Sequence, residues 1–260
     1  MKKMREKSLS EVNMDSDRRI MAHKQILSTK PMLRDVFDEN FRLMEQLAKR
    51  HLTSDGDALE LGSGAVSLKK ILPTVITSDV MPSEYNDRCI DAMDMDIRSN
   101  SLSAIFAQNV FHHIPNPEKF FHEADRVLRG GGGVIMIEPF YGPLASFIYR
   151  TFISDEIFDP KQQSWKSQLT GPMLGANQAL SYIVFKRDKH IFEEKFPQFE
   201  IVETVILNNF LRYILSGGLN FSRLLPDWLA APIRIMEFLL KPLNWVFGIH
   251  YVLVLRKKCG

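Results

Sequence analysis

Three acidic side chains and a pair of glycines are spaced through the first half of the chain in a pattern that suits a nucleoside ligand. Glu60 stands at the end of an apolar run, and Gly62 and Gly64 follow it. Two glycines allow a tight turn and let a ligand lie against the main chain. Asp79 ends the next apolar run and is placed to accept hydrogen bonds from two ribose hydroxyls. Asp91 follows a third short run and is placed to accept one from an adenine amino group.

The residues around the glycine turn distinguish between two kinds of nucleoside cofactor. A dinucleotide fingerprint has glycine or alanine at the sixth position of GxGxxG and sets a pyrophosphate on the N-terminus of the next helix. We expect a helix at 66–71, with its free N–H groups pointing at the ligand. However, Ser67 occupies the sixth position, and Glu60 would repel a pyrophosphate. S-adenosylmethionine (SAM) carries an ammonium, a sulfonium and a ribose but no phosphate, so it fits this turn better.

Alternating strand and helix patterns must bring these residues together. Apolar and β-branched runs predict strands at 57–64 (with the turn), 74–79, 88–91, 102–107, 134–138, 199–206 and 250–255, with a tight reversal at 129–133. Helical spacing predicts helices at 33–52, 66–71, 118–128 and 187–196. This alternation favours a parallel, doubly wound α/β sheet, whose ligand binds beyond the carboxyl ends of the strands. The polar residues at those ends are Glu60, Asp79, Asp91, Asn109, His112, His113 and Glu138.

The motifs in this order resemble those of class I SAM-dependent methyltransferases. The matching segments are Glu60-Leu61-Gly62-Ser63-Gly64, Asp79, Asp91-Ala92, Gln108–Ile114 and Arg126–Gly132, and the likeness is best to the branch with the type 11 methyltransferase domain. It covers residues 55–140, and the strands near 199–206 and 250–256 fit the closing hairpin of the family. The resemblance implies a Rossmann-like, doubly wound, mostly parallel seven-stranded sheet with an antiparallel last strand and a helical insertion or lid.

The resemblance also implies a binding site for SAM, with the methionine end at the glycine turn, the ribose at Asp79 and the adenine after the third strand. The residues predicted to form it are Glu60, Gly62, Ser63, Gly64, Asp79, Val80, Asp91, Ala92 and Asn109. Three positions depart from the family: Val66 stands where a third glycine is frequent, Asp96-Ile97 replaces a Pro-Phe pair, and Ser103 replaces an aspartate. These changes predict a reshaped loop that retains the anchoring acids.

Candidate catalytic residues lie at the same strand ends, where an acceptor would meet the methyl group. They are His112, His113 and Tyr141, beside Glu138. Methyl transfer from a sulfonium is an in-line displacement that depends mostly on alignment, and it needs a base only if the acceptor must lose a proton. Either histidine suits that role. Adjacent histidines on a turn are expected to point in different directions, so we expect no metal site.

The rest of the chain bears on domains and on the acceptor. We expect residues 1–54 to form an N-terminal extension with a covering helix and 55–260 to form the methyltransferase domain, with helical and aromatic insertions at 143–198 and 208–248. Segment 224–247 mixes aromatic residues with Arg234 and Lys241. Such a mixture predicts either peripheral contact with a membrane or a cover that packs over the sheet. We therefore expect a small acceptor, apolar or linked to a lipid or glycan.

Composition and charge limit the kinds of partner and the cellular location that we expect for the protein. A net charge of +2 gives no reason to expect a nucleic-acid partner. The cysteines, Cys89 and Cys259, lack metal-binding spacing, and the chain has neither a signal-peptide pattern nor a membrane-length apolar run, so we expect a cytoplasmic protein. The sequence leaves the oligomeric state open. The alternatives are an NAD(P)-dependent oxidoreductase of Rossmann type, or a binding module of the same fold without catalysis.

Overall fold

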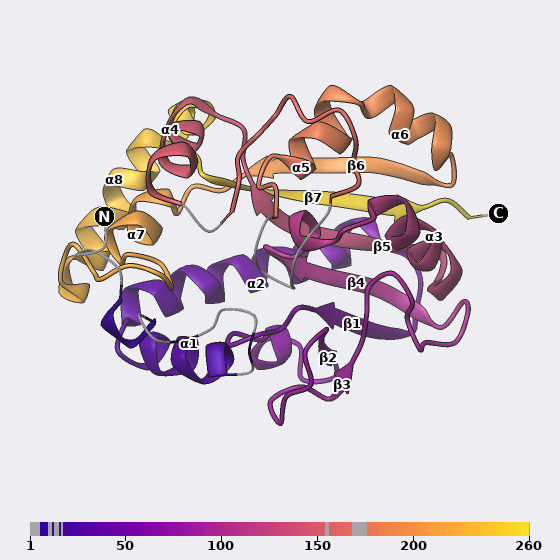
Figure 1. The fold of residues 1–260 in the computed structure, drawn as a ribbon, viewed down its shortest axis with the longest axis horizontal. Coiled ribbons are helices and arrows are strands. Elements are labelled where there is room, and N and C mark those ends of the chain that lie inside the picture. Colours follow the sequence, from indigo (N-terminus) through magenta and orange to yellow (C-terminus); the bar gives the residue numbers. More distant parts are fainter. Residues whose placement is uncertain are drawn as a thin grey trace.

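A single sheet of seven strands organises the chain, in the order β3-β2-β1-β4-β5-β7-β6 (Figure 1). The computed structural model describes residues 6–9, 12, 16, 18–153, 156–167 and 176–259. The strands are β1 (Asp57–Leu61), β2 (Ile76–Asp79), β3 (Arg88–Cys89), β4 (Leu102–Gln108), β5 (Leu128–Pro139), β6 (Phe199–Ile206) and β7 (His250–Lys257). Strands β1 to β5 are parallel, and β7 is antiparallel to both of its neighbours, β5 and β6. The predicted fold class, including the antiparallel last strand, is confirmed.

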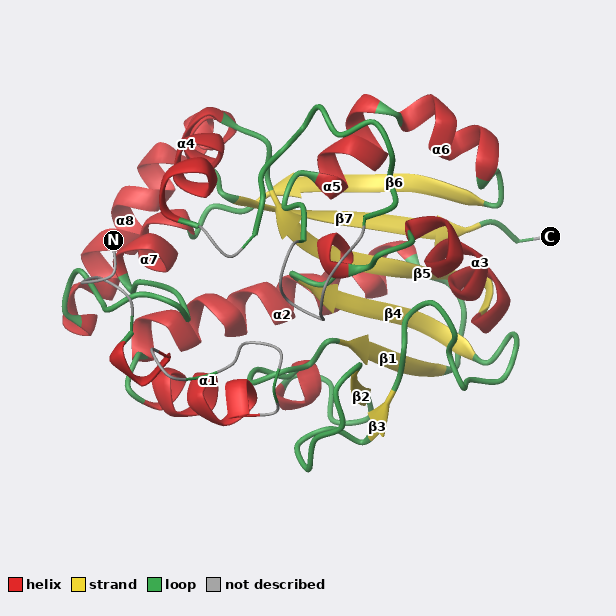
Figure 2. Cartoon of the chain, in the orientation of Figure 1, coloured by secondary structure: helices red, strands yellow, loops and turns green. Residues whose placement is uncertain are grey.

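Helices cover both faces of the sheet (Figure 2). They are α1 (Arg18–Ser28), α2 (Pro31–His51), α3 (Pro117–Val127), α4 (Pro143–Phe152), α5 (Leu180–Tyr182), α6 (Lys189–Lys195), α7 (Phe210–Leu215), α8 (Ala230–Leu240) and α9 (Asn244–Phe247), with a π-helix at Ile183–Arg187. Short 3-10 helices lie at Lys7–Leu9, Leu68–Lys70, Phe111–His113, Asp227–Leu229 and Lys241–Leu243. No helix in the described ranges is both long enough and apolar enough to traverse a bilayer.

The alternation of side chains along β4 shows how the two faces are built. Ile105 and Ala107 join the core beneath α3 and α6, while Ala104 and Phe106 join the core beneath α2. Successive side chains of a strand point to opposite faces, so an apolar strand supplies both cores. Helix α2 packs on the sheet through Phe37, Phe41, Met44 and Leu47, as its helical spacing predicts.

The glycine run after α3 departs from the prediction. Residues 128–133 belong to β5 and do not form a separate reversal. The register of β5 against β4 shifts between Leu128 and Gly133, so the run is a bulge within the strand. A Cβ at Gly133 would lie 2.2 Å from the Leu255 carbonyl oxygen of β7. Glycine at this position permits the close approach of β7. Local sequence reasoning sees only the run of glycines and predicts a turn from it.

Candidate active site

The glycine turn after β1 is held together by the carboxylate of Glu60. One carboxylate oxygen accepts hydrogen bonds from the Ser63 and Ser67 hydroxyls at 2.9 and 2.8 Å, and the other accepts one from the Leu68 N–H at 2.9 Å. Gly62 has a φ of +63°, and a Cβ there would lie 2.4 Å from a methyl group of Val110. Burial raises the pKa of Glu60, and these three hydrogen bonds oppose that rise.

The predicted helix at 66–71 is wrong, because only a 3-10 helix, Leu68–Lys70, follows the turn. Pro73 leaves too few residues for a stable helical nucleus. The first N–H groups of this segment are also occupied: Leu68 donates to Glu60, and Lys69 donates to the Ser67 hydroxyl at 3.0 Å. A pyrophosphate needs such N–H groups to be free. Two N–H groups that could hold a phosphate after this turn are therefore occupied, which argues against the oxidoreductase alternative.

Asp79 ends β2 as predicted, and it is buried beside a cation from the N-terminal region. Its Oδ1 accepts the Met81 N–H at 3.0 Å, and its Oδ2 lies 4.0 Å from a guanidinium nitrogen of Arg19 on α1. The Nε of Arg19 is buried without a hydrogen-bond partner. Arg19 also lowers the pKa of His113, so its charge lies near Asp79 and also acts on His113.

The predicted adenine side is more open. Asp91 is exposed and accepts the Met93 N–H at 2.8 Å, which fixes the turn after β3. Ala92 is partly buried and Val80 is exposed. Val80 follows β2, and Asp91 and Ala92 follow the neighbouring strand β3. The contact of these three residues with the cofactor stays a prediction.

Asn109 lies at the end of β4 in a strained backbone conformation. Its φ is +55°, in the left-handed region that residues other than glycine rarely adopt. Its N–H donates to the Ile137 carbonyl at 2.7 Å, while its side-chain Oδ1 is buried and unpartnered. The neighbouring Gln108 Oε1 is in the same state. Buried polar atoms usually have a partner, and such orphans beside the glycine turn fit a cofactor with donor groups, such as the ammonium of SAM.

His112 lies between two carboxylates. Its Nδ1 is 2.6 Å from Glu138 at the end of β5, and its Nε2 is 3.4 Å from Glu156. The other oxygen of Glu138 accepts the N–H groups of Val110 and Phe111 at 3.0 and 2.8 Å. Burial lowers the pKa of His112, but the two carboxylates outweigh it and raise the pKa to about 10.

His113 is turned toward the same carboxylate as His112. Its Nε2 lies 3.8 Å from Glu156, and the two imidazole ring centres are 4.2 Å apart. The expectation that these histidines point in different directions is therefore wrong. Burial and the His112 charge lower the pKa of His113 to about 3, and its Nδ1 has no hydrogen-bond partner.

Tyr141 lies among aromatic side chains near the end of β5. Its ring centre is 4.0 Å from that of Tyr182 and 5.9 Å from that of Phe158. Tyr149 of α4 continues this group, with its ring centre 5.4 Å from Phe158. The third catalytic candidate therefore belongs to an apolar wall.

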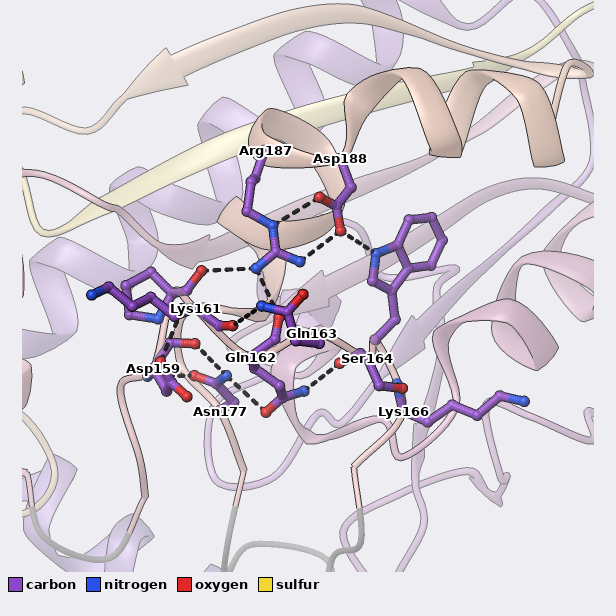
Figure 3. A network of polar contacts seen from close by, with 11 residues as sticks. Asp159, Lys161, Gln162, Gln163, Ser164, Lys166, Asn177, Arg187 and Asp188 are labelled. Atoms are coloured by element: carbon purple, nitrogen blue, oxygen red, sulfur yellow. Dashed lines mark hydrogen bonds and ion pairs between the residues drawn. The ribbon is translucent and has the colours of Figure 1, made fainter.

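A polar network around Asn177 and Arg187 holds the loop segment that includes Asp159, Gln162 and Ser164 (Figure 3), and Glu156 lies a few residues before this segment. The backbone of Ile157 bonds to Ala176 and Gln178, both at 2.9 Å. Asn177 binds Asp159 and Gln162 through its side chain, and Arg187 donates to the carbonyl groups of Pro160 and Gln162. These contacts span the π-helix and the loop, and they fix the backbone next to Glu156.

A comparison with protein families matches the first half of the sheet. Residues 59–136, from β1 into β5, match the family model described as a methyltransferase domain. These residues are similar to a methyltransferase domain. The predicted resemblance to methyltransferases is confirmed over these residues, and the match supports an enzyme of this kind, with SAM as the expected cofactor.

Solved structures with a similar arrangement are distant in sequence from this chain. A putative sarcosine dimethylglycine methyltransferase from Galdieria sulphuraria is 15% identical, with 87% of this chain and 88% of that one covered at a TM-score of 0.47. Geranyl diphosphate C-methyltransferase from Streptomyces coelicolor A3(2) is 14% identical, with 82% and 76% covered at a TM-score of 0.45. Phosphoethanolamine N-methyltransferase 2 from Haemonchus contortus is 14% identical, with 97% and 59% covered at 0.48. Curated proteins include no detectable sequence relative.

Two residues of the site carry no signal in the sequence. Arg19 comes from the N-terminal extension, and Glu156 comes from an insertion between β5 and β6. Neither stands at the end of a predicted strand, and both reach the site only through tertiary packing. Residues 154–155 and 168–175 of the predicted insertion lie outside the described residues.

Proposed function

We propose that the chain is a SAM-dependent methyltransferase that acts on a small acceptor, apolar or linked to a lipid or glycan, which it meets at a membrane surface. The observation that carries the proposal is the orientation of α8. Ile233 and Glu237, four residues apart on one side of the helix, are buried. The opposite side exposes Ile235, Phe238 and Leu239 by 64%, 70% and 70%. The helix thus directs a carboxylate inward and large apolar side chains outward.

The apolar side of α8 continues into neighbouring segments. The exposed large apolar residues from the loop before α8 to α9 are Leu224, Trp228, Ile235, Met236, Phe238, Leu239, Leu243 and Trp245. We call this set the apolar helix face. Soluble monomers rarely expose so many large apolar residues in one segment. Tryptophan suits the membrane interface, and the exposed Lys241 suits anionic headgroups.

The apolar helix face is connected to the active site through aromatic packing. Helix α4 packs against α9 and exposes Phe147 and Phe152. On its inner side Tyr149 packs on Phe158, which in turn packs on Tyr141. An apolar acceptor drawn from a membrane would thus meet aromatic side chains on its way to the histidine pair.

The chain's own residues have separable roles in the proposed reaction. Bound SAM supplies a methyl group on a positively charged sulfur. Asp79 holds the ribose, the glycine turn and Asn109 hold the methionine portion, and Asp91 borders the adenine. His112, His113 and Tyr141 contact the acceptor, with the free Nδ1 of His113 as a hydrogen-bonding atom. Alignment of the acceptor with the methyl group contributes most of the acceleration, up to about 7–11 kcal/mol.

The same reasoning extends to domains and location. We infer that residues 1–54 form a covering extension, because α1 brings Arg19 to Asp79, and that 55–260 form the catalytic domain with its insertions. We infer a cytoplasmic protein with peripheral membrane contact.

Vesicle flotation tests the membrane part of the proposal. The wild-type protein is mixed with vesicles of phosphatidylcholine alone or with phosphatidylglycerol, beside a Trp228→Ala/Trp245→Ala variant. The control variant is Tyr85→Ala, which removes an exposed aromatic residue outside the apolar helix face. We expect the wild type and the control to float, most with anionic vesicles, and the double variant to float several-fold less. If the wild type fails to float on either vesicle, the membrane proposal is wrong.

A further inference from the structure

We propose that His112, His113 and Glu156 form a binding site for a divalent transition-metal ion of the zinc type. The potential ligand atoms, one from each side chain, all lie within 4.8 Å of one another. The Nε2 atoms of His112 and His113 are 3.4 and 3.8 Å from the Glu156 carboxylate. Ligands about 2.0–2.2 Å from a common metal lie roughly 3.3–3.5 Å apart in a tetrahedral site. A small contraction of the group, with release of the Nε2 proton of His112 to solvent, thus gives three protein ligands.

The second layer of contacts has the form that metal-binding histidines require. A ligand histidine generally gives its other ring nitrogen to a carboxylate or carbonyl, which fixes the ring and its tautomer. Here Nδ1 of His112 lies 2.6 Å from Glu138, and Glu138 is itself held by two backbone N–H groups. The Glu156 carboxylate accepts a hydrogen bond from the Gln178 amide at 2.8 Å. Both ends of the group are therefore oriented before an ion binds.

The site is buried and rigidly supported. His112 and Glu138 are almost fully buried, while His113 and Glu156 retain slight exposure. The histidines lie on one 3-10 helix, Phe111–His113, and the loop of Glu156 is fixed by the network around Asn177 and Arg187 (Figure 3). These contacts hold the described part of this loop, residues 156–167, against the rest of the protein.

The ligand types select the class of ion. Two imidazoles and one carboxylate suit Zn²⁺, Co²⁺, Ni²⁺, Fe²⁺ and Mn²⁺, whereas Mg²⁺ and Ca²⁺ prefer all-oxygen sites. Three protein ligands leave one or more positions open, as in catalytic zinc sites. The site lies at the carboxyl ends of β4 and β5, where the acceptor is proposed to bind. An ion there would take an oxygen of the acceptor or a water as a further ligand. Ion binding itself does not depend on the proposed acceptor or on the membrane contact.

Cobalt titration tests the site directly. Protein dialysed against a chelator and then freed of it is titrated with Co²⁺, and the visible d–d absorption is recorded. We expect one Co²⁺ per chain, displaced by Zn²⁺, and at least tenfold weaker binding in His113→Ala and Glu156→Gln. His122→Ala, which removes an exposed histidine of α3, should bind as the wild type does. The proposal is overturned if the wild type takes up no Co²⁺, or if both site variants bind it as tightly as the wild type.

A thermal melt with and without Zn²⁺ shows whether each variant is folded and whether the folded form binds the ion. A ligand that binds only the folded state raises its melting temperature. We expect Zn²⁺ to raise the melting temperature of the wild type and of His122→Ala, and to leave folded His113→Ala and Glu156→Gln unshifted. Equal shifts in all four proteins would place the ion elsewhere and contradict the proposal. SAM titration of the metal-free wild type, run in parallel, keeps this result separate from cofactor binding.

Discussion

Arg212 of α7 donates a hydrogen bond from Nε to the carboxylate of Glu237 on α8 at 2.6 Å, and both side chains are almost fully buried. The guanidinium also donates two hydrogen bonds to Glu39 of α2, each 2.7 Å long. This network ties α8 to the body of the protein through its polar side. It accounts for the outward orientation of the apolar helix face.

Substitution of Glu237 should destabilise the fold. Glu237→Gln leaves Arg212 with only the partly exposed Glu39 as a charge partner, and removal of one partner of a buried pair costs about 3–5 kcal/mol. Because both residues line a cavity of about 300 Å³ that can admit water, we expect the lower end, about 3 kcal/mol. Urea unfolding measures the change. Glu45→Gln, which breaks the exposed Lys49 pair, should cost less than about 1 kcal/mol.

An alanine at Gly62 should clash with Val110. A Cβ there would lie 2.4 Å from a Val110 methyl group, and the φ of +63° adds strain. We expect Gly62→Ala to lower the free energy of unfolding by about 2–4 kcal/mol. Gly64→Ala shares the positive φ, but a Cβ there would make only an ordinary contact, 3.7 Å from the Gly62 carbonyl oxygen, so it should cost only about 1–2 kcal/mol.

A double-mutant cycle separates the clash from the backbone strain. In Gly62→Ala/Val110→Ala the clashing methyl group is gone, so we expect a favourable coupling of at least about 1 kcal/mol. Strictly additive effects of the two substitutions would show that the turn relaxes without contact to Val110.

His23 should make stability depend on pH. Burial, and then the charge of Arg19, lowers the pKa of His23 from 6.5 to about 4. The unfolded chain thus binds more protons between these values, and the free energy of unfolding falls as pH drops from 6.5 toward 4. We expect His23 to contribute a loss of about 2 kcal/mol between pH 7 and pH 5.

The measurement for His23 is urea unfolding of the wild type and of His23→Gln at both pH values. The difference between their pH-dependent losses isolates His23 from other histidines. A variant that loses as much stability as the wild type would contradict the lowered pKa.

The sequence predicts correctly those features that depend mainly on neighbouring residues in the chain. The strand at 199–206 is found with its exact bounds because its residue types alone favour a strand. Glu60, Asp79 and Asn109 are placed correctly at strand ends because parallel strands present their carboxyl ends at one edge. The segment after the glycine turn is misjudged, because Ser67 and Glu60 bind the N–H groups that a helix would leave free.

Long-range relationships could not be predicted. The convergence of His112 and His113 on Glu156 depends on a loop more than forty residues away in sequence. The bulge at Gly133 depends on the approach of β7. No periodicity or motif encodes such contacts, since they arise only when the layers pack.

The binding of SAM at the turn after β1 is the central claim, and isothermal calorimetry with SAM and NADH tests it most directly. We expect the wild type to bind SAM and not NADH. Asp79→Ala should bind SAM at least about tenfold more weakly, because a hydrogen bond to a charged group contributes about 1.5–3 kcal/mol. Asp96→Ala, whose side chain is 97% exposed, should bind as the wild type does. Tighter binding of NADH than of SAM, or unchanged SAM affinity in Asp79→Ala, would contradict the account.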